Sequence, residues 1–151
     1  MKALESEDSL AAFLRAFAEG TVPKKEWTHE AHLVMATCYL LEHPLEEATS
    51  RIRDGIQRYN LAVGGENTDT AGYHETLTIF WIGLLREALK EMDAEMDVGG
   101  TRIEKARAIA QRFGSQRDLF RKYYSFDVVQ SVDARRRWVE PDVSDESFPR
   151  H

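Results

Sequence analysis

Apolar residues recur every three or four positions along most of this chain, and no stretch alternates apolar with polar residues. The first spacing places side chains on one face of an α-helix, whereas alternation is typical of a half-buried β-strand. Leu10, Phe13, Leu14 and Phe17 form one such stripe. The pattern therefore predicts an all-α protein, a single-domain bundle in which the apolar stripes of the helices meet in one core.

Residues that begin and end helices divide the chain into about five or six helices. Ser6 or Ser9 suits the start of the first helix, and Gly20 suits its end. Thr28 suits the start of the second helix. The third helix is expected from Pro44 to about Val63, the fourth from about Tyr73 to Met92, and the fifth from Thr101 to about Phe113. A sixth, short helix is expected from Ser115 or Asp118 to Tyr123. One or two further helical turns are expected in Ser131–Trp138.

The loop before the fourth helix is rich in glycine, asparagine and threonine. Asp69 or Thr70 is expected to cap that helix, because short polar side chains accept hydrogen bonds from its first free N–H groups. Residues 1–142 are expected to form one helical domain, and residues 143–151 a polar C-terminal tail.

Composition narrows the class of protein. The 151 residues suffice for a core without disulfides, and the only cysteine, Cys38, fits a reducing compartment. A net charge of -6 disfavours nucleic acid and anionic membranes as partners, since proteins that bind them usually carry a basic excess. No apolar run suits a signal peptide or a membrane span. We expect a cytoplasmic protein with a small-molecule ligand, and the sequence also allows a homodimer.

Three histidines stand out. His29 and His32 are three positions apart and share a face of the second helix, and His74 lies at the start of the fourth helix. If consecutive helices run in alternating directions, the second and fourth helices begin at the same end of the bundle. The three imidazoles are then expected to converge there.

Three imidazoles with one open position are the ligand set of a catalytic zinc or iron ion. Such a metal lowers the pKa of a bound water and creates a nucleophile near neutral pH. Glu75 is the expected fourth ligand or general base. Two of the histidines with Glu75 or Asp69 would instead suit a non-haem iron. The first hypothesis is therefore a metal-dependent enzyme that acts on a small polar or anionic molecule.

Two further hypotheses stay open. In the second, the same pocket is free of metal and either binds a small molecule or uses His74 and Glu75 as acid and base, with Tyr73 supplying a hydrogen bond. In the third, the chain is a helical interaction module without catalysis. The sequence does not decide whether the protein is an enzyme.

Arginine and tryptophan side chains are further candidates for the same site. Among the arginines of the later helices, Arg135 is the one expected to hold an anionic substrate through two hydrogen bonds. Trp27 is expected to pack as a hydrophobic staple at the start of the second helix, or else to form a pocket wall. Trp81 lies in mid-helix and is expected in the core.

Two motifs carry a resemblance, W-T-H-x-x-H at residues 27–32 and G-Y-H-E-T-x-T at residues 72–78. Together with residues 123–125 and 134–142, they resemble a family of small bacterial helical proteins of unassigned function. The resemblance spans about residues 13–142. It implies a shared fold and a shared site, to which Tyr73, His74, Glu75, Tyr124 and Arg135 would belong.

Overall fold

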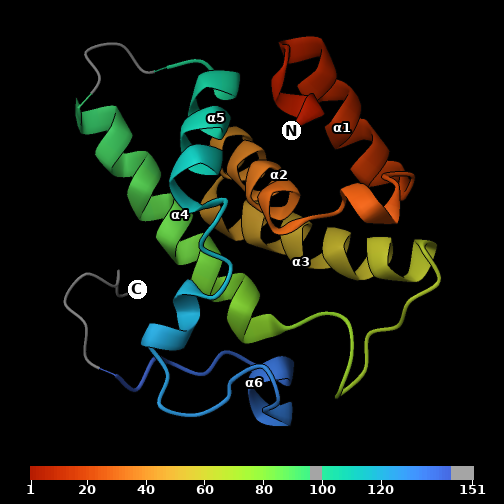
Figure 1. The fold of residues 1–151 in the computed structure, drawn as a ribbon, viewed down its shortest axis with the longest axis vertical. Helices are drawn as coiled ribbons and strands as arrows, with labels where there is room; N and C mark the ends of the chain where they lie inside the picture. The colour runs from red at the N-terminus through yellow and green to blue at the C-terminus, as the bar shows by residue number, and fades with distance from the viewer. Residues whose placement is uncertain (96–99, 144–151) are drawn as a thin grey trace.

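A computed structural model describes residues 1–95 and 100–143, and within these ranges every regular element is helical (Figure 1). The all-α fold expected from the sequence is confirmed. The predicted polar tail lies outside the described residues except for Val143. None of the described helices is long and apolar enough to cross a membrane. The α-helices are α1 (Glu7–Glu19), α2 (His29–Glu42), α3 (Leu45–Ala62), α4 (Glu75–Glu95), α5 (Arg102–Phe113) and α6 (Val132–Arg136).

Short polar side chains begin several helices at the predicted positions. Ser6 accepts a hydrogen bond from the Ser9 amide at the start of α1, and Thr28 accepts one from the Ala31 amide at the start of α2. At the other end of α1, Gly20 has a positive φ of 74°. These contacts satisfy N–H and C=O groups that a helix end otherwise leaves without partners.

The segment after α5 differs from its prediction. The helix expected to end at Tyr123 is a short 3-10 helix, η3 (Leu119–Lys122). A single short α-helix, α6, follows it, and Ser131 caps this helix through the Ala134 amide. Neither element is long enough to be stable alone, so their positions depend on contacts with α4.

Helix α2 lies at the centre of the bundle and packs against α3, α4 and α5 (Figure 1). Its residues Leu33, Val34 and Met35 point in successive directions around the helix, and none is more than 2 % exposed. A helix that is apolar on all sides is surrounded by other elements. The middle of α2 is therefore enclosed by other helices, and it holds the partly buried first turn in position.

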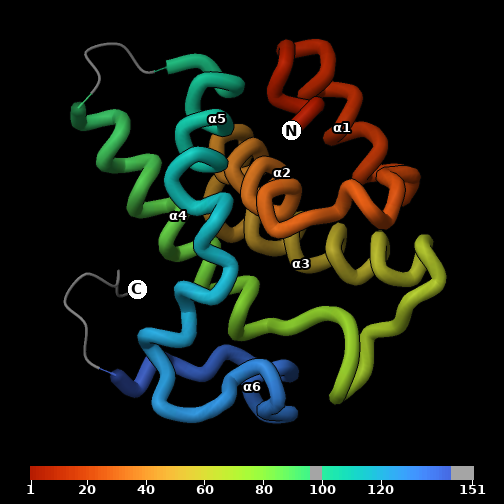
Figure 2. The backbone as a smooth tube through the Cα atoms, viewed as in Figure 1, coloured from red at the N-terminus to blue at the C-terminus, as the bar shows by residue number. Residues whose placement is uncertain are grey.

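The C-terminal segment folds back beneath the start of α4 (Figure 2). Phe80 of α4 packs there against Tyr123, Tyr124 and Val128, all at most 5 % exposed. This second apolar cluster fixes the position of the first two turns of α4. It also explains why residues 119–136 adopt a defined path although their helices are short.

Thr37 provides a test of this packing. Its side chain is fully buried in α2, and its hydroxyl oxygen has no hydrogen-bond partner among the described residues. A buried hydroxyl without a partner destabilises the fold. We expect Thr37→Val to raise the free energy of unfolding by about 1 kcal/mol, measured by urea denaturation.

Thr76 is the matched control, because it is equally buried but its hydroxyl donates to the Arg137 carbonyl and accepts from the Val139 amide. Thr76→Val should therefore lower the free energy of unfolding by about 1–3 kcal/mol. Equal effects of the two substitutions would contradict this view of the Thr37 hydroxyl.

Candidate functional site

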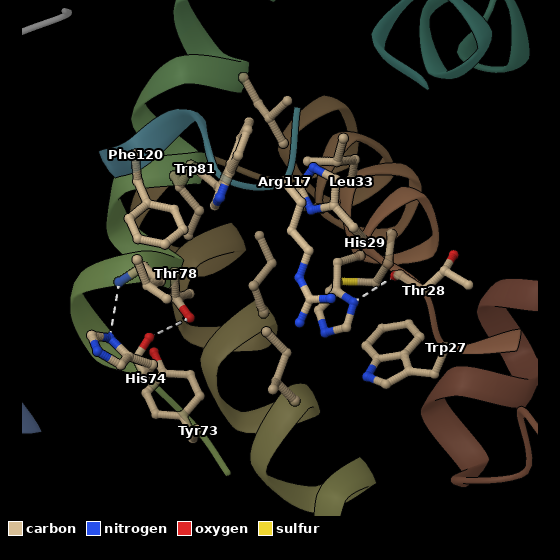
Figure 3. Close-up of a pocket in the computed structure, with 18 of the residues that line it drawn as sticks. Trp27, Thr28, His29, Leu33, Tyr73, His74, Thr78, Trp81, Arg117 and Phe120 are labelled. Carbon is tan, nitrogen blue, oxygen red and sulfur yellow. Dashed lines mark hydrogen bonds between the residues drawn. The ribbon is translucent and has the colours of Figure 1, made fainter. Parts of the chain in front are cut away.

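A pocket of about 490 Å³ opens where the starts of α2 and α4 meet α3 and the connection after α5 (Figure 3). This volume suits a small organic molecule. Most of the wall is apolar or aromatic, with Trp27, Leu33, Met35, Ile52, Trp81 and Phe120 among the lining residues.

The three predicted histidines all line this pocket. His29 and His32 come from the first turn of α2, and His74 lies directly before α4. The two helix starts therefore meet at one place, as the expected helix order required. What the three rings do there is set by the hydrogen bonds of their nitrogens.

Both ring nitrogens of His74 are used within the fold. Nε2 donates to the Val128 carbonyl oxygen at 2.9 Å, and Nδ1 accepts the Leu77 amide at 3.2 Å. The second bond caps α4, which explains why this helix begins at Glu75 and not at Tyr73. The predicted cap by Asp69 or Thr70 is wrong. A capping residue must lie within a turn of the first free amides, and Asp69 instead pairs with Arg136.

Within the part of the chain that the structure describes, His29 and His32 each retain one ring nitrogen without a hydrogen bond. Nε2 of His29 donates to the Phe113 carbonyl oxygen at 3.2 Å, and Nδ1 of His32 donates to the Thr28 carbonyl oxygen at 2.7 Å. A carbonyl oxygen only accepts, so these bonds fix the tautomer of each neutral ring. His32 is left with a lone pair on Nε2, and His29 with one on Nδ1.

The three histidines are not arranged as the predicted metal site requires. A metal needs one lone pair from each ligand, and His74 has none to give. Among residues 1–95 and 100–143, no three histidine, cysteine, aspartate or glutamate side chains are grouped so that they could hold a metal ion. The residues present therefore do not fit the zinc or iron centre that their spacing suggested.

Glu75 is engaged elsewhere as well. Both of its carboxylate oxygens accept hydrogen bonds from Arg53, at 2.9 and 2.8 Å, and one also accepts the Tyr73 hydroxyl at 2.5 Å. Burial opposes ionisation of Glu75, but these hydrogen bonds outweigh it and lower its pKa. A carboxylate stabilised in this way is a weak general base, so the geometry does not favour the catalytic role predicted for Glu75.

Tyr73 lines the pocket, and the loop before it determines its position. Asn67 donates to the Gln57 carbonyl and accepts the Tyr73 amide, both through its side-chain amide group. Gly72 has a φ of +83°, and a Cβ there would lie 1.9 Å from the Glu66 carbonyl oxygen. Only glycine fits that position, so the loop places Tyr73 in a single way.

Arg135 lies outside the pocket lining. Its guanidinium donates to the carbonyl oxygens of Gly72, Tyr73 and Val129 and joins the 66–74 loop to the C-terminal segment. Tyr124 likewise donates its hydroxyl to the Val139 carbonyl. Both residues lie outside the pocket lining and support its wall through these hydrogen bonds.

Arg117 is the pocket cation, and sequence reasoning missed it. It lies between α5 and η3, lines the pocket, and forms no ion pair or hydrogen bond with the part of the chain that the structure describes. No carboxylate side chain is among the lining residues. The one available signal in the sequence was the position of Arg117, two residues after the Gly114–Ser115 pair that predicts the end of a helix.

Aromatic rings line the same pocket as this cation. The rings of Trp27 and His32 lie 4.0 Å apart between centroids, and those of His29 and Trp81 lie 4.8 Å apart. Trp27 also stacks on Phe17, with centroids 4.9 Å apart. Trp27 therefore has both roles predicted for it. It packs at the start of α2 against His32 and the core, and it forms part of the pocket wall.

All three histidines are neutral at pH 7. Burial lowers the pKa of His29, His32 and His74, and in the case of His32 to about 4. The positive charge of Arg117 contributes to the lowering for His29 and His32. Among the described residues that line the pocket, Arg117 is therefore the one charged side chain, and the imidazoles are neutral.

The lowered pKa values predict how stability depends on pH. In the unfolded chain a histidine has a pKa near 6.5, so between about pH 6.5 and 4 the unfolded state binds more protons than the folded state. The free energy of unfolding should therefore fall as the pH falls through this range. Each histidine adds a slope of up to about 1.4 kcal/mol per pH unit.

His32→Gln isolates one contribution. Urea denaturation at pH 7 and pH 5 should show a smaller loss of stability in the variant than in the parent. An equal loss in both proteins would mean that His32 takes up its proton as readily in the folded state as in the unfolded one.

Comparison with protein-family models, curated proteins and solved structures yields no match. The resemblance to a bacterial family therefore stays a prediction, and the function has to be argued from the pocket itself.

Proposed function

We propose that the protein binds a small organic anion with an apolar body in the pocket between α2, α3 and α4. The observation that carries this proposal is the isolated cation, Arg117, on a wall that is otherwise apolar or neutral. Of the hypotheses drawn from the sequence, this is the one in which the pocket functions without metal.

Charge supports an anionic ligand. An arginine beside an apolar surface gains most from a partner that neutralises it, because the attraction is stronger where water is partly excluded. Its planar fork of N–H donors matches a carboxylate or a phosphate. His29 and His32 lie nearby but are neutral, so Arg117 alone supplies the positive charge that attracts the anion.

Shape and polarity support an apolar body. Ile52 and Leu33 are at most 2 % exposed and form the inner wall, and the rings of Trp27 and Trp81 line the pocket as well. Flat aromatic walls favour a flat or aliphatic ligand and contribute binding free energy through buried area. Simple inorganic anions would leave these surfaces unused.

Arg117→Gln tests the proposal. The parent should bind 3-phenylpropionate more tightly than its neutral analogue 3-phenylpropionamide, as measured by isothermal titration calorimetry. The substitution should weaken carboxylate binding by about tenfold or more and leave amide binding nearly unchanged, since only the charge-assisted hydrogen bonds are lost.

Arg51→Gln is the matched control. Arg51 is exposed on α3, pairs with Glu47 and does not line the pocket. Arg51→Gln removes the same charge from the protein as Arg117→Gln but leaves the pocket unchanged. The carboxylate affinity of this variant should therefore equal that of the parent. Equal affinity of the parent for the carboxylate and the amide would overturn the proposal.

A further inference from the structure

Beyond its anion-binding side, the pocket has a second polar side with a different chemistry. Figure 3 shows Tyr73, His74 and Thr78 on one side of the pocket, and Trp27, His29 and Arg117 on the other. A ligand that fills the pocket meets both sides. Where the hydroxyl hydrogens on this second side point determines which kind of ligand group can bind there.

The single hydrogen of the Tyr73 hydroxyl is committed to Glu75. The pKa of Glu75 is lowered, so its carboxylate is ionised at neutral pH and can only accept. The contact of 2.5 Å between the Tyr73 hydroxyl and Oε1 therefore has Tyr73 as its donor. Burial raises the pKa of Tyr73, which keeps this hydrogen in place. The Tyr73 oxygen can therefore only accept, and the Thr78 and Arg53 side chains lie beside it.

Thr78 has the same polarity. Its hydroxyl donates to the His74 carbonyl oxygen at 2.9 Å, one helical turn earlier, so its oxygen is also left as an acceptor. His74 offers nothing to a ligand, because both of its ring nitrogens are bonded within the protein. This side of the pocket accepts hydrogen bonds through Tyr73 and Thr78, and their hydroxyls have none to donate.

We propose that the ligand carries a hydrogen-bond donor, a hydroxyl or an N–H group, at the end opposite its anionic group. Arg117 supplies donors at one side of the pocket, and Tyr73 with Thr78 supplies acceptors at the other. The ligand class is thus a hydroxy or amino acid in the broad sense, with an apolar body between its two polar ends. This inference rests on the proposed function and specifies its ligand.

Matched ligands test the inference. Affinities are measured by calorimetry for 3-(4-hydroxyphenyl)propionate, 3-phenylpropionate and 3-(4-methoxyphenyl)propionate, and for 2-naphthoate with its 6-hydroxy and 6-methoxy derivatives, because the two scaffolds differ in length. In at least one series the parent should bind the hydroxy compound about fivefold to tenfold more tightly than both others, the value of one buried hydrogen bond.

The double substitution Tyr73→Phe, Thr78→Val should abolish this preference, because it removes both acceptors on this side of the pocket, and Tyr73→Phe alone should reduce it. Tyr39→Phe is the matched control. Tyr39 lies on α2, is half-buried and does not line the pocket, so its loss should not alter the preference. A preference that survives the double substitution would overturn the inference.

Glu75→Gln provides a second variant that keeps the Tyr73 ring. A neutral amide can donate to the Tyr73 oxygen, which releases the Tyr73 hydrogen toward the ligand. The ratio of hydroxy to methoxy affinity should then fall toward or below one. An unchanged ratio would show that the hydrogen of Tyr73 does not point to Glu75.

The outcomes separate the two proposals. If no acid of either series binds the parent, the proposed function fails and this inference fails with it. If the unsubstituted acids bind and the hydroxy compounds gain nothing, the pocket binds organic anions and only the donor requirement is wrong.

Discussion

The two hydrogen bonds of the His74 imidazole are the interaction on which the geometry of the site depends. They cap α4 and tie the start of that helix to Val128, 54 residues later in the chain. The residue is only 8 % exposed, so protonation of the ring would break the bond to the Leu77 amide in a place where water cannot replace it. These two bonds fix the start of α4 and, with the loop before it, the position of Tyr73 in the pocket wall. The residue predicted as a metal ligand is thus the structural centre of the site.

Neutral histidines give the pocket its electrostatic character. His29 and His32 lie near Arg117, and burial keeps both uncharged at neutral pH. Charged imidazoles would make a site for a polyanion, and carboxylates in the lining would neutralise the arginine. With neither present, one positive charge faces a largely apolar wall. That combination favours a ligand with a single anionic group and a hydrophobic body. The ion pair with Arg53 keeps the Glu75 carboxylate out of the described lining.

The sequence predicted those features that depend on neighbouring residues. Thr28 and Thr101 cap α2 and α5 as expected, because a cap acts within three residues of itself. The meeting of the starts of α2 and α4 also followed from helix order. The role of His74 did not, since its partner Val128 is distant in sequence and only the fold shows that both ring nitrogens are occupied. The choice between Arg117 and Arg135 depends in the same way on how the C-terminal segment packs.

The indole N–H signals of the three tryptophans offer the most direct measurement of ligand binding. Trp27 and Trp81 line the pocket, whereas Trp138 packs in the second apolar cluster and serves as an internal control. In a two-dimensional ¹⁵N–¹H NMR titration with 3-phenylpropionate, the account predicts that the signals of Trp27 and Trp81 shift together and saturate while that of Trp138 stays in place. No shift at millimolar ligand, or a shift of Trp138 alone, would contradict an organic-anion site in this pocket.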